Sequence, residues 1–117
     1  MDDYFGFYFP DEVTMFELLG VSRLVEDDEA WTYEISDDYG FTLRFSCKVF
    51  EQYFHVSIRH NDEVIQSANH KGVWTISPLT LVENAGLRAE SQIGNVRTVV
   101  DMSWKPRVRV LWRTTLA

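Results

Sequence analysis

Apolar and polar side chains alternate with a period of two through most of the chain from Trp31 onward. A β-strand places successive side chains on opposite faces, so this pattern predicts strands with one face on a core and the other in solvent. Such one-sided burial is typical of antiparallel sheets. The stretches that show the pattern are 31–36, 41–49, 54–59, 73–77, 87–93, 96–104 and 107–113.

Short stretches of turn-forming residues separate the predicted strands. Glycine, asparagine and aspartate tolerate the backbone angles of tight turns. The predicted turns lie at 37–40, 61–62, 69–72, 84–86 and 94–95. Pro106 has no N–H to donate to a sheet, so we expect it at a strand start, a bulge or an edge. We see no linker or internal repeat, and expect residues 1–117 to form a single globular domain.

One helix is predicted near the N-terminus. Pro10 and Asp11 are start signals, and Gly20 is a natural C-cap. An apolar stripe predicts the side of this helix that packs on the sheet, and its residues are Val13, Phe16 and Leu19, widened by Met15 and Leu18. The aromatic run at 4–9 favours a strand or an extended segment. A second, short helix is predicted at 79–85.

The fold class that follows is α+β and rich in β-structure. We expect a curved antiparallel sheet of about seven or eight strands with one N-terminal helix covering a face or an opening. The pattern leaves three arrangements open, which are a meander, a half-barrel and a sandwich.

Charge is spread unevenly along the chain. The formal net charge is −7, yet residues 1–40 carry twelve acids and one base, while residues 41–117 carry ten bases and six acids. In one interpretation the acidic first third packs beside the basic C-terminal strand. In the other, part of it forms a surface that attracts a basic partner and speeds association. Four excess positive charges cannot match eleven excess negative ones, so we favour the second for part of the acidic set. The overall acidity argues against nucleic-acid binding.

No residue pattern names a reaction. Cys47 is the only cysteine, which excludes a disulfide within the chain and a multi-cysteine zinc site. It falls on the apolar face of its predicted strand, where a thiol is inert. His55 and His60 fall on opposite faces of an ideal strand, and His70 flanks a predicted turn. We therefore expect no catalytic residue, metal or cofactor, and a protein that is not an enzyme.

The candidate partner-binding residues come from two acidic runs in predicted loops. They are Glu26, Asp27, Asp28 and Glu29 in the first run, and Asp37, Asp38 and the adjacent Tyr39 in the second. The chain also has four tryptophans. A tryptophan exposed beside the acids would supply an aromatic anchor of the kind found in protein interfaces.

The acidic runs 26–29 and 37–38, together with the lack of an active-site motif, resemble the immunity proteins of bacterial polymorphic toxins, including contact-dependent inhibition systems. The resemblance implies a non-catalytic protein that blocks a cognate toxin, most simply one of the nuclease type, in a one-to-one complex. It also implies action in the cytoplasm of the producing cell. The acidic start and the lack of a long apolar run agree with that location and predict no membrane partner.

Two other functions are compatible with the sequence. One is a small-molecule-binding β-barrel with an aromatic-lined pocket and the helix as its lid. The other is an enzyme that uses Cys47 or a histidine beside a carboxylate. An exposed Cys47 near an imidazole would favour the enzyme, whereas a filled core with exposed acids and aromatic side chains favours the inhibitor.

Overall fold

The computed structural model describes residues 2–4, 7–24, 30–48, 51–80 and 85–116. Within these residues the chain forms one helix and ten strands. In chain order they are β1 (Asp2–Tyr4), β2 (Phe7–Phe9), α1 (Glu12–Leu19), β3 (Trp31–Ser36), β4 (Phe41–Lys48), β5 (Tyr53–His60), β6 (Glu63–Lys71), β7 (Val73–Thr80), β8 (Ala85–Ile93), β9 (Val96–Ser103) and β10 (Arg109–Leu116).

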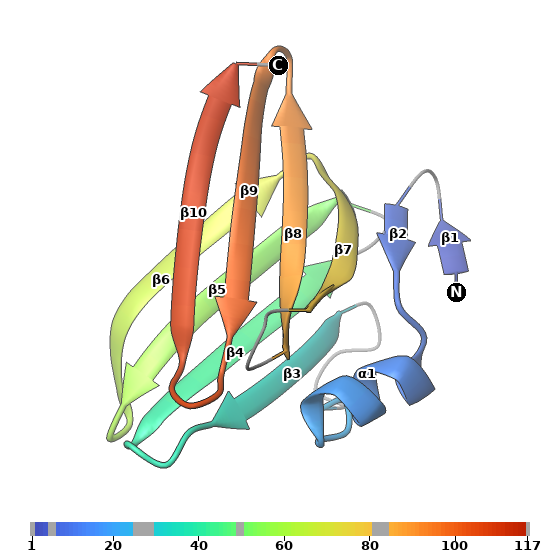
Figure 1. Cartoon of the computed structure of the whole chain (residues 1–117). Coiled ribbons are helices and arrows are strands. Elements are labelled where there is room, and N and C mark those ends of the chain that lie inside the picture. The colour runs from blue at the N-terminus through green and yellow to red at the C-terminus, as the bar shows by residue number, and fades with distance from the viewer. Residues whose placement is uncertain (1, 5–6, 25–29, 49–50, 81–84, 117) are drawn as a thin grey trace.

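The strands form two sheets that pack face to face (Figure 1). One sheet has the order β1-β2-β7-β8-β9-β10 and the other the order β3-β4-β5-β6. The eight strands after the helix pair only antiparallel with one another, whereas β2 joins β7 in parallel. The predicted β-rich α+β class is confirmed, and of the three open arrangements the structure adopts the sandwich. The sheets do not close, so the β-barrel of the alternative function is wrong.

The core lies between the two sheets and contains the residues that the alternation places inward. Tyr33 stacks on Phe45 with ring centroids 5.5 Å apart, and Phe45 lies 6.2 Å from Phe54. Large buried rings dominate because each removes much apolar area from water. Cys47 is fully buried on the same face of β4, as predicted.

Helix α1 begins and ends at the predicted signals. The side chain of Asp11 accepts a hydrogen bond from the backbone N–H of Thr14 at 2.8 Å, which caps the first turn. Gly20 has a φ of 76°, and its N–H donates to the carbonyl of Phe16 at 2.8 Å. Only a residue without a Cβ adopts that backbone angle at little cost, so the glycine ends the helix.

Strand β6 was not among the predicted strands. Most of its side chains are exposed, because β6 is an edge strand and its pairing with β5 is interrupted by a bulge near Arg59. Polar residues on both faces therefore hide the period of two. The predicted turn at 69–72 is wrong for residues 69–71, which continue β6, and only Gly72 connects to β7.

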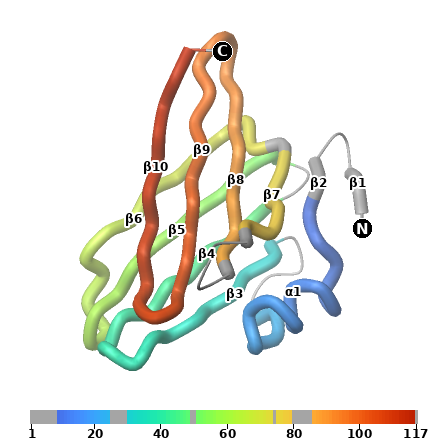
Figure 2. The backbone as a smooth tube through the Cα atoms, in the orientation of Figure 1, coloured from blue at the N-terminus to red at the C-terminus, as the bar shows by residue number. Residues whose placement is uncertain are grey.

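Gly72 carries the chain from one sheet to the other. Its φ is 72°, and a Cβ there would lie 2.6 Å from the carbonyl oxygen of Gln92. The tight packing brings β6 beside β8. Figure 2 shows the β8–β9 hairpin running on past the four-stranded sheet, where Ile93 is 62% exposed.

Two predicted features fall partly outside the described residues. In the region of the predicted short helix at 79–85, the ends belong to strands, since Leu79 and Thr80 lie in β7 and Ala85 begins β8. That helix is therefore wrong at both ends, and residues 81–84 are not described. The predicted turn at 84–86 is likewise wrong for Ala85 and Gly86, which lie in β8.

Candidate functional site

The second acidic run forms the turn between β3 and β4, as predicted. Asp38 and Tyr39 are exposed there, with Tyr39 57% accessible. Asp37 is engaged within the protein. Its Oδ1 accepts hydrogen bonds from the backbone N–H of Tyr39 at 2.8 Å and of Phe41 at 3.0 Å.

Asp37 also joins this turn to the other sheet. Its Oδ2 accepts a hydrogen bond from the backbone N–H of Val108 at 2.8 Å, which links the β3–β4 turn to the β9–β10 loop. Partial burial works against the charged carboxylate. The three backbone donors and the nearby Arg107 outweigh it and lower the pKa of Asp37. The carboxylate therefore stabilises the contact between the sheets.

Basic side chains accompany the turn. The guanidinium carbon of Arg107 lies 5.1 Å from the centroid of the Tyr39 ring, a cation–π contact. A hollow of about 470 Å³ runs beside the turn, and its lining includes Asp38 and Tyr39 from the turn, Lys105 from the β9–β10 loop, and Leu19 and Val21 from the end of α1 and the residues after it. The turn is thus of mixed charge and continuous with the end of the helix.

The first acidic run, Glu26, Asp27, Asp28 and Glu29, lies outside the described residues. The chain before it is fixed by a bridge between Leu24 and Thr32, with the backbone N–H of Leu24 donating to the carbonyl of Thr32 at 2.8 Å. These four residues stay a prediction.

The outward side of α1 presents apolar and acidic side chains together. Val13 is 67% exposed and Phe16 is 53% exposed, so placing them on the core-facing stripe was wrong. The helix packs through Met15 and Leu19, which are buried, with Leu18 partly buried. Of the single predicted stripe, the side with Met15, Leu18 and Leu19 faces the core, whereas the side with Val13 and Phe16 faces outward.

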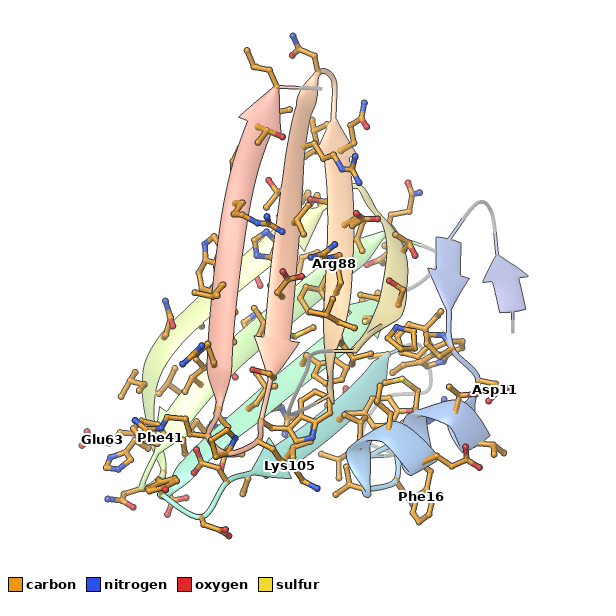
Figure 3. All side chains as sticks on the ribbon, viewed as in Figure 1. Asp11, Phe16, Phe41, Glu63, Arg88 and Lys105 are labelled. Atoms are coloured by element: carbon orange, nitrogen blue, oxygen red, sulfur yellow. The ribbon has the colours of Figure 1, made fainter. Side chains whose placement is uncertain are left out.

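Acids flank the exposed apolar pair on α1. Asp11, Glu12 and Glu17 are exposed, and Figure 3 shows Phe16 pointing away from both sheets with Asp11 at the start of the same helix. Glu12 makes a long ion pair with Arg23 at 3.7 Å. We call the set Asp11, Glu12, Val13, Phe16 and Glu17 the acidic helix face. The sequence pattern did not reveal this face, because the three-residue spacing of Val13 and Phe16 also fits a core-facing stripe.

Residues considered for catalysis are placed where chemistry is unfavourable. Burial raises the pKa of the Cys47 thiol, so the reactive thiolate is suppressed. His55 and Tyr53 both bond the side-chain oxygen of Asn69. Burial and, to a smaller extent, His55 lower the pKa of His70. Among the described residues no group of three histidine, cysteine or carboxylate side chains is arranged to hold a metal ion.

Three tryptophans have described side chains, and none of the three lies exposed beside the acidic runs. Trp104 is buried and Trp31 is partly buried against Phe9. Trp112 is exposed on β10, where it meets His70 edge to face at 6.3 Å. The exposed aromatic rings beside acids are instead Tyr39 in the β3–β4 turn and Phe16 on α1.

Ion pairs between described residues hold the C-terminal bases mainly against acids of their own sheet. Arg88 contacts Asp101 at 2.7 Å, and Arg97 contacts Glu90 at 2.6 Å. The interpretation in which the acidic first third neutralises the basic C-terminal strand therefore holds at Asp37, beside Arg107, and does not extend to the acidic helix face. No helix of the described residues is long and apolar enough to cross a membrane.

A search of solved structures finds a chain with the same fold. It belongs to a contact-dependent growth inhibition toxin–immunity protein complex from Klebsiella pneumoniae 342, and the TM-score is 0.87 at 15% sequence identity. The alignment covers 96% of this chain and all of that one. No family model and no curated protein matches the sequence. The predicted resemblance is thus confirmed for the fold alone, which this chain shares with a chain of that toxin–immunity protein complex.

Proposed function

We propose that the chain is a non-catalytic immunity protein that neutralises a cognate toxin in the cytoplasm of the bacterial cell that produces both. It binds a basic surface of the toxin, of the kind a nuclease uses to hold phosphates. The complex is one to one and requires neither metal nor cofactor. The acidic helix face is the centre of the binding surface.

The observation that carries this proposal is the exposure of Phe16 and Val13 among three acids. Exposure of a large apolar ring to water is unfavourable, so covering the ring with a partner contributes favourable free energy to binding. Interfaces concentrate binding energy in such anchors, and surrounding charges steer the partner and exclude competitors. An acidic rim selects a basic partner.

The similar fold supports the proposal from a second direction. The Klebsiella complex pairs a toxin with an immunity protein, and the chemistry of this chain favours the immunity component. Cys47 is sealed in the core, and the histidines contact neighbouring rings and amides. A toxic enzyme needs a reactive constellation at its surface, whereas an inhibitor needs a rigid scaffold with an exposed anchor.

The predicted turn residues extend the same surface. Asp38 and Tyr39 share a hollow with Leu19 and Val21, at the end of α1 that follows the acidic helix face. We assign Asp38 and Tyr39 to the rim of the interface. Asp37 contributes by holding the turn in place. Glu26, Asp27, Asp28 and Glu29 add negative charge between α1 and β3 in the sequence, and we assign them to the same interface.

The test is inhibition of the toxin domain encoded next to this gene. Co-expression of the chain should restore growth of cells that produce the toxin domain. We expect Phe16→Ala to weaken the purified complex by about 10- to 100-fold, the loss typical of a central aromatic anchor. Titration calorimetry measures the affinity, and circular dichroism checks that the variant folds.

Ile93→Ala is the matched control, since Ile93 is similarly exposed but lies at the tip of the β8–β9 hairpin. It should leave the affinity within about twofold of the wild type, as for most truncations outside an anchor. Equal losses for both variants, or no loss for Phe16→Ala, would remove the acidic helix face from the interface. Failure to protect the cells would reject the immunity function itself.

A further inference from the structure

The C-terminal three strands form a basic face on an acidic protein. Residues 85–116 carry six bases and two acids, although the whole chain has a net charge of −7. The strand register places Arg88, Asp101 and Leu111 in one cross-strand row and Glu90, Val99 and Arg113 in the next. These rows lie on the face turned away from the core, where Arg88 projects in Figure 3.

The two acids of this face, Asp101 and Glu90, both pair with arginines of the same face. Asp101 accepts two hydrogen bonds from Arg88, at 2.7 and 3.0 Å, and lies 3.4 Å from Arg113. The hydrogen bond with Asp101 raises the pKa of Arg88, so the guanidinium stays charged. Glu90 is held by Arg97 at 2.6 Å. The remaining positive charge belongs to the β9–β10 loop and the start of β10.

A hollow of about 480 Å³ lies at that end of the face. Its apolar walls are Leu79, Met102, Pro106 and Leu111, and its basic residues are Lys105, Arg107 and Arg109. Ser103 and Asp101 complete the lining, and the carboxylate of Asp101 is already bound by Arg88. Leu111 is 58% exposed on the floor of this region. Arg109 is exposed and makes no ion pair with any described residue.

We propose that this hollow binds an acidic segment of a partner protein, with carboxylates on Arg109 and Arg107 and an aliphatic side chain on Leu111 and Pro106. Guanidinium groups pair with carboxylates through two parallel hydrogen bonds, which gives both strength and orientation. The apolar walls exclude water beside these pairs and so strengthen them. Charge complementarity and the aliphatic floor together define the occupant.

A peptide fits this hollow better than a nucleic acid does. Proteins that bind single strands stack bases on aromatic rings. The described lining of the hollow is aliphatic, basic and polar, with Asp101 as its acid, and it presents no aromatic ring. The ring of Tyr39, in the neighbouring turn, already lies against Arg107.

The site is separate from the acidic helix face and does not depend on the proposed function. Lys105 and Pro106 line both this hollow and the one beside Asp38 and Tyr39, so the β9–β10 loop divides a basic site from an acidic rim. The molecule therefore offers two surfaces of opposite charge to its partners.

The test titrates the isotope-labelled chain with a short peptide of alternating glutamate and leucine, acetylated and amidated at its ends. We expect amide shifts in two-dimensional NMR spectra to concentrate at Ser103, Arg109 and Leu111. Arg109→Ala should weaken binding by about tenfold, because it removes a charged hydrogen-bonding partner. Leu111→Ala should weaken it by about threefold through lost apolar contact. Unchanged melting curves establish that the variants fold.

Arg97→Ala is the matched control, because it changes the net charge equally on the same face but outside the hollow. It should change the affinity by less than about twofold. An equal loss for Arg97→Ala, shifts spread over all basic strands, or no binding at millimolar peptide would overturn the proposal. Tighter binding of a short oligouridylate at the same residues would assign the hollow to nucleic acid instead. Toxin inhibition by the same variants is scored separately, so each proposal can fail without the other.

Discussion

The β3–β4 turn and helix α1 both combine acids with an aromatic ring, but they use those acids differently. In the turn, Asp37 accepts three backbone hydrogen bonds and Arg107 covers the Tyr39 ring. On the helix, Phe16 and Glu17 point into solvent. The difference teaches that an acid indicates a binding surface only where its carboxylate is not already engaged within the protein. On the helix this applies to Glu17, since Asp11 accepts the N–H of Thr14 and Glu12 pairs with Arg23.

The cause lies in the position of each element. The turn sits where one sheet meets the loop of the other, so its backbone N–H groups and that of Val108 need an acceptor, and Asp37 supplies it. The helix lies beside β3 at the margin of the sandwich (Figure 1), and only its Met15–Leu19 side is covered. Its other side faces outward and presents its charges to solvent.

The largest effect that would sharpen this comparison is on stability. Asp37→Ala should lower the free energy of unfolding by about 1–3 kcal/mol, since it leaves backbone N–H groups at the junction without their acceptor. Asp38→Ala should change it by less than about 0.5 kcal/mol, as is usual for an exposed side chain. Urea unfolding of the two variants measures both values. If both variants lowered the free energy of unfolding by the same small amount, Asp37 would be no more important for stability than the exposed Asp38.

An intermediate effect concerns the rate of association with the proposed toxin partner. Glu17→Lys should slow association by about three- to tenfold at low salt, because it reverses a charge at the centre of the acidic helix face. Glu51→Lys makes the same charge change in the β4–β5 loop and should slow it less. Stopped-flow association at several salt concentrations measures the difference. Identical rates for the two variants would mean that net charge alone attracts the partner.

The smallest effect is the pH dependence of stability contributed by Asp37. The folded pKa is depressed, so the unfolded chain binds a proton first and the stabilising ion is lost as the pH falls through the folded pKa. Between about pH 5 and pH 3 the wild type should therefore lose stability more steeply than Asp37→Asn, which cannot ionise. Chemical unfolding across this range tests it. Parallel curves would show that the hydrogen bonds do not favour the charged form.

Most of the strands could be predicted, because burial of one sheet face imposes a period of two on the sequence. The same rule fails for β6, an edge strand whose faces are both largely polar and exposed. It also cannot separate a sandwich from a half-barrel, since the two place the same residues inward. The crossing at Gly72 from one sheet to the other decides that, and a single glycine carries no unique signal for it.

The candidate site was predicted only in part. Asp38 and Tyr39 are exposed as expected, whereas the stabilising role of Asp37 depends on Val108, seventy-one residues away. The exposure of Phe16 was missed because the predicted apolar stripe is wider than the side of α1 that packs on the core. The sequence shows the acids around residue 17, but it does not show that they lie beside an exposed aromatic ring.

The sequence alone determined the alternation that builds the sheets, the caps that bound α1, the burial of Cys47 and the division of charge between an acidic first third and a basic remainder. Tertiary structure decided which side of α1 meets the core, which carboxylate is consumed at a junction, and where the basic residues border an apolar hollow. Local pattern depends on neighbours a few residues apart, whereas exposure and the pairing of charges depend on contacts between segments that only the packed sandwich brings together.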